Sequence, residues 1–145
     1  MKPIGYWLSR TDQALTGYMD GMLAEFGLTR LAWQVLNVVE DDPQATDARV
    51  LTALAANATA PRLAAAIETV VAGGWVTRPE PARLALTDDG RARLAEAAGR
   101  VNAFRDLSTA GITQEEYRTA VTVLERMTRN LEIAAAEQGR ARPDR

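Results

Sequence analysis

Cysteine and histidine are both absent from the 145-residue chain. Their absence excludes disulfide bonds, thiol redox sensing, cysteine or serine–histidine catalysis and almost every transition-metal site. Two carboxylate pairs remain, Asp41–Asp42 in a predicted loop and Asp88–Asp89 in the first turn of a predicted helix. At such positions carboxylates form turns or interact favourably with the helix dipole. The sequence therefore predicts no catalytic residue, no metal, no cofactor and no enzymatic activity.

Long apolar runs are absent as well. No run is long enough to cross a bilayer, and residues 1–5 lack the apolar core of a signal peptide. The composition, 47% hydrophobic and 25% charged, is ordinary for a globular protein, and the length suits one domain. We expect a cytoplasmic protein with no membrane partner.

Net positive charge is also lacking, because 17 Lys and Arg stand against 19 Asp and Glu, giving −2. Between Asp47 and Thr87 four arginines face three carboxylates, and four minus three leaves +1. Apart from Lys2, every cation is an arginine, whose planar guanidinium suits bidentate contact with phosphate or guanine. The richness in arginine and alanine fits a GC-rich genome equally well.

The first half of the chain reads as three helices separated by short breaks. Apolar residues three or four apart predict a long amphipathic helix over 4–26, which Gly27 ends. Thr29 caps a second helix over 30–39. A third, over 48–56, is capped by Thr46 or Asp47 and is too short to be stable without packing on the next helix.

Residues 51–93 predict a winged helix-turn-helix. Its second helix begins at Thr59, a capping residue followed by Pro61 in the first turn, and ends at the Gly73–Gly74 pair. Two short strands, 75–77 and 84–86, flank a proline-rich turn and form the wing. Thr87 then caps the following helix.

The last third predicts two more helices. One spans 91–107, and the other begins at a Thr113-x-x-Glu116 capping box, in which each side chain bonds to the other residue's backbone amide. Apolar residues recur along this last helix at about the coiled-coil interval, at Tyr117, Val121, Leu124, Thr128 and Leu131. Residues 139–145 predict a disordered polar tail.

These residues carry a resemblance to the MarR (multiple antibiotic resistance regulator) family of bacterial transcription factors. The similarity covers about residues 4–133, and several motifs follow one another in the family's order. They are Gly27-Leu28-Thr29, Trp33-Gln34-Val35-Leu36, Leu63-x-x-x-Ile67-Glu68, Gly74-Trp75-Val76-x-Arg78, Leu86-Thr87-x-x-Gly90-Arg91 and Gly111-Ile112-Thr113.

The resemblance implies a mainly α fold with a small β-hairpin wing. It assigns residues 28–107 to a winged helix-turn-helix DNA-binding domain, and 1–27 and 108–138 to flanking dimerisation helices. The apolar stripes of the two terminal helices favour the same homodimer, because a small winged unit has too little surface to cover both. The alternative is that both stripes are buried within one subunit.

The helix that begins at Thr59 is the one that would enter a major groove, and this predicts the DNA-binding residues. The exposed residues early in it meet base edges, which predicts Thr59, Arg62 and Ala65 or Ala66 as the reading surface. Thr52 and Asn57 are placed to donate to phosphate, and Arg78 and Arg83 flank the wing turn, within reach of phosphate or the minor groove. For Arg62 the alternative is a solvated arginine at a helix start.

Two departures from the family bear on DNA affinity. Where members commonly have Thr-Arg in the recognition helix, this chain has Ala64-Ala65, and its wing lacks the Asp-Arg-Arg tip. In the family the Asp-Arg pair fixes the wing arginine against its own domain. We therefore expect weak or shape-led DNA binding with a shallow dependence on salt.

A small-ligand pocket is a further expectation. Aromatic walls and one cation are expected where the first helix meets the winged unit, from Tyr6, Trp7, Arg10, Tyr18, Met22 and Trp33. Such a pocket suits a flat aromatic acid or phenol, with its carboxylate paired to Arg10. The alternative is that Trp7, Tyr18 and Trp33 belong to the core.

The sequence thus predicts a MarR-type, double-stranded-DNA-binding transcription regulator that acts as a homodimer, a repressor released by a small ligand. The alternative function is a MarR-fold module that binds small molecules or proteins, with weakened or lost DNA recognition.

Overall fold

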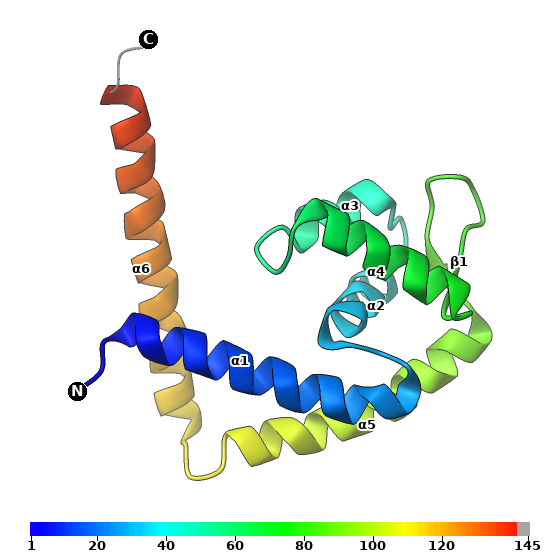
Figure 1. Cartoon of the computed structure of the whole chain (residues 1–145), viewed down its shortest axis with the longest axis horizontal. Coiled ribbons are helices and arrows are strands. Elements are labelled where there is room, and N and C mark those ends of the chain that lie inside the picture. The colour runs from blue at the N-terminus through cyan, green and yellow to red at the C-terminus, as the bar shows by residue number, and fades with distance from the viewer. Residues whose placement is uncertain (142–145) are drawn as a thin grey trace. The chain divides into compact units, whose positions relative to one another are not determined.

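The computed structural model describes residues 1–141, and these are mainly helical with one two-stranded sheet (Figure 1). Two compact units divide the chain, Met1–Phe104 and the part from Arg105 onward. No helix in the described residues is both long and apolar enough to cross a membrane. The elements are α1 (Ile4–Leu23), a short 3-10 turn η1 (Ala24–Phe26), α2 (Arg30–Asp41), α3 (Asp47–Ala53), α4 (Ala60–Ala72), β1 (Val76–Thr77), β2 (Ala85–Leu86), α5 (Asp88–Ser108) and α6 (Gln114–Ala141).

Four threonines begin the inner helices as predicted. Each hydroxyl accepts a hydrogen bond from a backbone amide three residues further on, which satisfies a donor that the helix itself leaves free. The pairs are Thr29 with Ala32, Thr46 with Arg49, Thr59 with Arg62 and Thr87 with Gly90. Between the two predicted caps of α3, the structure therefore selects Thr46.

Several predicted boundaries need correction. The third helix ends at Ala53 instead of about residue 56. The helix after the wing, α5, begins at Asp88, where the Thr87 cap places its start, so the range 91–107 given from the apolar pattern begins three residues too late. The last helix continues to Ala141, so residues 139–141 are helical and only 142–145 of the predicted tail lie outside the described part. Of the Gly73–Gly74 pair, only Gly74 has the left-handed conformation, with φ of 78°.

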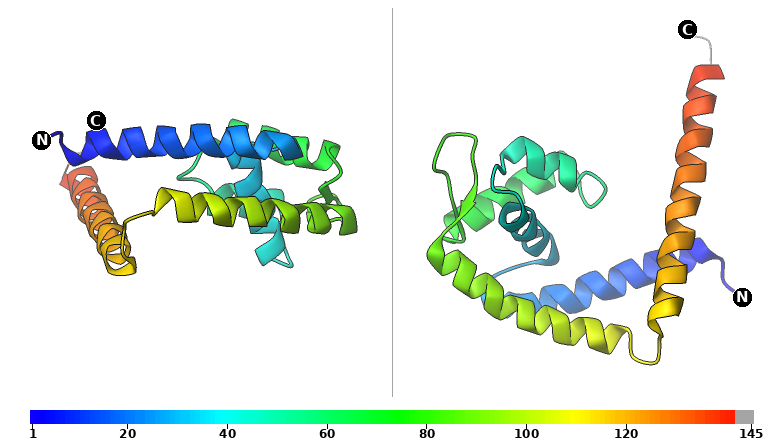
Figure 2. Two further views of the ribbon diagram at one scale, coloured as in Figure 1. Left: turned by 90° about the horizontal axis from the view of Figure 1, so that it is seen from below. Right: turned by 180° about the vertical axis from the view of Figure 1, so that it is seen from behind.

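The core of the first unit forms where α2 packs against its neighbours. Figures 1 and 2 show α4 beside α2, with the wing loop at the C-terminal end of α4. No polar side chain is buried among the described residues, so burial of apolar surface provides the driving force. The most completely buried side chains are Leu23, Val35, Leu36, Val50, Leu63, Ile67, Val70, Leu84 and Leu94.

The wing is a short antiparallel ladder in which Val76 pairs with Leu86 and Thr77 with Ala85. The predicted strand residues Trp75 and Leu84 lie outside this ladder. The amide of Leu84 instead donates to the carbonyl of Ala45 at 3.0 Å, just before α3. The return half of the wing is thereby fastened to the loop between α2 and α3.

Gly90 holds the beginning of α5 close to the backbone of Trp75. A Cβ at residue 90 would stand 2.1 Å from the Trp75 carbonyl oxygen. We expect Gly90→Ala to lower the free energy of unfolding by about 2 kcal/mol or more, because backbone cannot yield to overpacking as a side chain can. Urea unfolding measures this. The control is Gly99→Ala in the same helix, where nothing lies within 4 Å. Equal effects of the two substitutions would contradict the packing described.

The second unit consists of little besides α6. Its predicted capping box is confirmed: the amide of Thr113 donates to Glu116 Oε1, and the amide of Glu116 donates to Thr113 Oγ1, both at 3.0 Å. Two hydrogen bonds hold the pKa of Glu116 below its ordinary value. The larger effect comes from the backbone of Thr113 and the smaller from the side chain of Thr113. Between Gln114 and Arg140 no residue is buried, although the helix carries an apolar stripe.

Candidate nucleic-acid interface

The outward face of α4 carries the three residues predicted to read bases. Leu63, Ile67 and Val70 point into the core, and Thr59, Arg62 and Ala65 are exposed. Thr59 uses its hydroxyl to cap the helix. The Arg62 guanidinium makes no ion pair or hydrogen bond within residues 1–141, and it stands in the first turn of the helix.

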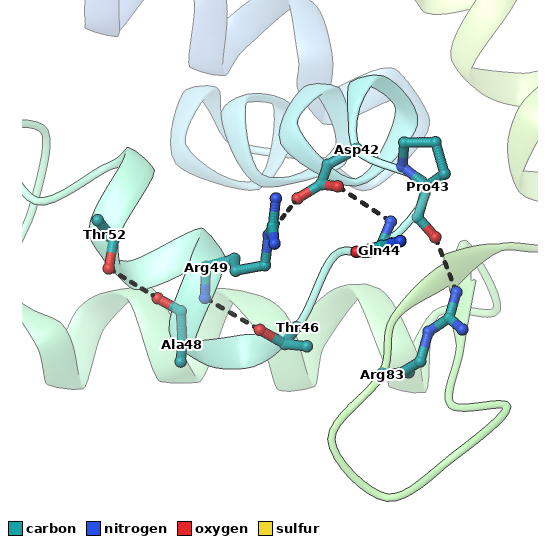
Figure 3. A network of polar contacts seen from close by, with 8 residues as sticks. All are labelled: Asp42, Pro43, Gln44, Thr46, Ala48, Arg49, Thr52 and Arg83. Atoms are coloured by element: carbon teal, nitrogen blue, oxygen red, sulfur yellow. Dashed lines mark hydrogen bonds and ion pairs between the residues drawn. The ribbon is translucent and has the colours of Figure 1, made fainter.

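The two residues before α4 that were predicted to donate to phosphate differ in whether their side chains already donate a hydrogen bond within the chain. Asn57 is exposed in the turn between α3 and α4. Thr52 is also exposed, but its hydroxyl donates to the carbonyl of Ala48 at 3.0 Å (Figure 3). A hydroxyl has a single proton, so Thr52 is an acceptor in this arrangement and not the phosphate donor that the sequence predicted.

Arg78, directly after β1, bonds to the body of its own unit. Its Nη1 lies 2.6 Å from Asp47 Oδ1, and its Nη2 lies 3.1 Å from Asp47 Oδ2 and 2.7 Å from Glu68 Oε1. These bonds, first those with Asp47 and then the one with Glu68, raise the pKa of Arg78. We call the three residues the Arg78 cluster. The predicted reach of Arg78 into the minor groove is not the arrangement seen.

Arg83 also bonds within its own unit. Its Nη2 donates to the carbonyl of Pro43 at 2.7 Å, and its Nε is buried without a partner (Figure 3). Its backbone forms a bridge with Thr46. Both arginines therefore fasten the base of the wing, and the one charged residue at the wing tip, in residues 79–82, is Glu80.

The charges around α3 are largely paired. Arg49 Nε lies 2.7 Å from Asp42 Oδ2 (Figure 3). A bond from the backbone of Gln44, together with the bond and charge of Arg49, holds the pKa of Asp42 below its usual value although desolvation opposes this. Of the four arginines in residues 47–87, Arg62 is thus the one with no carboxylate or carbonyl partner in the described structure.

Sequence reasoning missed Asp47 and Glu68 as partners of Arg78. They lie 31 and 10 residues before it in the chain. Charge pairs of this kind carry no local signature such as the i, i+4 spacing along a helix. The family's Asp-Arg wing pair is missing here, but the Arg78 cluster fixes the start of the wing in another way.

The six predicted ligand residues do not form one pocket within the subunit. Tyr6 and Trp7 make an edge-to-face pair at 5.0 Å, and Arg10 Nη1 donates to the Tyr6 hydroxyl at 2.8 Å. Tyr18 stacks on Phe104 at 5.0 Å. Twelve residues of continuous helix separate Tyr6 from Tyr18, which corresponds to about 18 Å.

The alternative prediction, that Trp7, Tyr18 and Trp33 belong to the core, is correct for one of the three. Trp33 is 7% exposed and belongs to the core of the first unit, and the half-buried Met22 packs against that core. Trp7 and Tyr18 are 52% and 53% exposed. Two aromatic side chains of α1 therefore remain uncovered in the single subunit.

Comparison with known proteins finds similarity in structure. No protein-family model and no curated protein sequence matches the chain. The transcriptional repressor CouR, bound to p-coumaroyl-CoA, aligns over 88% of this chain and 92% of its own, with a TM-score of 0.76 and 25% identity. A MarR-family protein of Mycobacterium tuberculosis in complex with DNA aligns over 88% and 98%, with a TM-score of 0.69 and 25% identity.

The reduced form of MarR from E. coli gives a TM-score of 0.70 at 20% identity, over 88% of this chain and 97% of its own. These neighbours confirm the predicted resemblance. The chain has the winged-helix fold of the MarR family of transcription regulators.

Proposed function

We propose that this chain, built on the MarR fold, is a DNA-binding transcription regulator that acts as a homodimer and places one α4 in the major groove of each half-site. The observation that carries the proposal is the outward face of α4, where Arg62 stands exposed without an internal partner. The solved complex of a structural neighbour with DNA supports the same use of the fold.

Base reading is assigned to Arg62 and Ala65. An arginine in the groove donates two of its guanidinium N–H groups to O6 and N7 of guanine, and an alanine methyl contacts the methyl group of thymine. Both side chains are exposed on the same helix, three residues apart, so they meet neighbouring base pairs. The exposed side chain of Asn57 is assigned to phosphate.

Dimerisation is supported by apolar surface that the single subunit leaves uncovered. On α6, Tyr117, Val121 and Leu131 are exposed, and on α1 so are Ile4, Trp7 and Leu8. Between Gln114 and Arg140 no side chain of α6 is buried, whereas most of the stability of a helix in a protein comes from the packing of its apolar face. A second copy of the chain, with the same stripes, supplies the missing apolar partner.

A small ligand is proposed to control DNA binding. The repressor CouR was solved with p-coumaroyl-CoA, which carries an aromatic acyl group. In this chain the exposed Trp7 and Arg10, with Tyr6, offer a ring surface and a cation in one place. We assign to them the binding of an aromatic acid or phenol that releases the regulator from DNA, as in a repressor.

A second candidate function is a module with the same fold that binds a small ligand but binds DNA weakly or not at all. Three of the four arginines in residues 47–87 are engaged within the subunit, which favours a binding module with weakened DNA recognition. Gel-shift with the promoter region beside its own gene separates the candidates. Retarded DNA supports the regulator, and no retarded DNA at low salt supports the module.

The salt dependence of DNA binding follows from the same charges. Each phosphate neutralised contributes about −0.9 to the slope of log affinity against log salt. With one free arginine on each α4, we expect a slope for the dimer no steeper than about −6. Fluorescence anisotropy between low and physiological salt measures it, and a steeper slope would mean that Arg78 and Arg83 leave their internal partners to contact phosphate.

A further inference from the structure

Glu68 is the one carboxylate on α4, and it lies on the exposed side of the helix that is proposed to contact DNA. Its side chain is 69% exposed. It follows Ala65 by three residues, so the two are neighbours on the helix surface, and Arg62 is the one other charged residue of the helix. A carboxylate at this place approaches the phosphates that line the major groove, and like charges within about a Debye length of 8–10 Å repel one another.

An ion pair with Arg78 restrains the side chain of Glu68. Its Nη2 lies 2.7 Å from Glu68 Oε1, and the same guanidinium grips both oxygens of Asp47 on α3. One cation therefore ties α3, α4 and the start of the wing together. The cluster has one positive and two negative charges, and one minus two leaves −1.

We propose that Arg78 is a positioning residue that neutralises and restrains Glu68 so that α4 can enter the groove, and that Glu68 limits the affinity for DNA. This inference rests on the proposed function. It reverses the role expected for Arg78 from sequence, since the side chain acts through Glu68 and does not itself contact the DNA.

The first test removes the charge of Glu68 and keeps its shape. Glu68→Gln retains an oxygen that accepts from Arg78, so the fold should be unchanged by circular dichroism and by its urea midpoint. We expect affinity for DNA to rise about threefold or more and the salt slope to become steeper by about 1 to 2 for the dimer, because one carboxylate that repels phosphate is removed from each α4. The matched control is Glu96→Gln, which removes the same charge from the exposed side of α5.

The second test removes the cation. Arg78→Gln leaves Glu68 and Asp47 without their partner, and we expect DNA affinity to fall about tenfold or more. The double variant, Arg78→Gln with Glu68→Gln, should bind DNA more tightly than Arg78→Gln by clearly more than the factor that Glu68→Gln gains over wild type, because Glu68 repels phosphate most when Arg78 no longer neutralises it. If Arg78 only braces the wing, the two substitutions should act independently and the two factors should be equal.

Three results separate the possibilities. If Glu68→Gln binds no more tightly than Glu96→Gln, or if the gain from Glu68→Gln is no larger in the Arg78→Gln background than in wild type, the inference is overturned while the proposed function stands. If the unmodified protein binds no duplex at low salt, the proposed function is overturned and this inference with it. Tighter binding of Glu68→Gln together with a larger gain from it in the Arg78→Gln background establishes the role assigned to Arg78.

Discussion

Arg62→Ala is expected to reduce affinity for a specific DNA site by about a hundredfold or more. One bidentate arginine–guanine contact contributes about 1–3 kcal/mol of discrimination, and a homodimer loses it at both half-sites. The structure offers no other unpaired arginine between residues 47 and 87 that could replace it. Anisotropy titration of wild type and variant at one salt concentration measures the loss.

The control for Arg62 removes the same charge elsewhere. Arg126→Ala lies on α6, exposed and on the opposite side from the apolar stripe, and should bind DNA within about twofold of wild type. Arg62→Lys adds a second comparison. A lysine keeps the charge but not the planar fork, so binding to unrelated DNA should persist while preference for the specific site is lost. Equal behaviour of Arg62→Ala and Arg126→Ala would remove Arg62 from the interface.

Charges placed in the stripe of α6 are expected to dissociate the homodimer. Val121 and Leu131 are 48% and 68% exposed in the single subunit, so replacing both with glutamate breaks no packing there. In a dimer the same carboxylates would be buried against apolar side chains, which is costly without a partner charge. We expect the dissociation constant to rise at least about a hundredfold, measured by sedimentation equilibrium.

The control for the stripe is Thr122→Glu, which places the same charge one residue away on the opposite side of α6. It should sediment as wild type does. The double stripe variant should also lose affinity for a two-half-site DNA, because separate subunits bind without the benefit of a linked second contact. A wild-type protein that is monomeric at tens of micromolar, or a stripe variant that remains dimeric, would contradict the proposed assembly.

The order of helices and the places where they begin could be predicted from the sequence. Thr29, Thr59, Thr87 and the Thr113–Glu116 box are local signals, and each is made by residues within three positions of one another. Helix ends were less predictable, as the early end of α3 at Ala53 shows. There the chain leaves the helix in a turn, in which the amide of Asn57 donates to the carbonyl of Leu54 at 2.9 Å.

The candidate site was only partly predictable. Exposure of Arg62 and Ala65 follows from helical periodicity once Leu63 and Ile67 are placed inside. The partners of Arg78 and Arg83 do not follow from helical periodicity. Asp47 and Pro43 come near these arginines only when the wing folds back on the α2–α3 loop. Five of the six predicted ligand residues lie along α1, and about 18 Å of helix separates Tyr6 from Tyr18. Composition alone does not show such a separation, and ligand binding by these residues stays a prediction.

Selection from a random pool of duplex DNA by the purified protein at low salt is the most direct test of a homodimer that reads DNA through α4. We expect enrichment of a twofold-symmetric site whose half-site centres are about one helical turn apart, each with a guanine whose selection is lost in Arg62→Lys. Enrichment of no sequence, or of sites without twofold symmetry, would contradict the account.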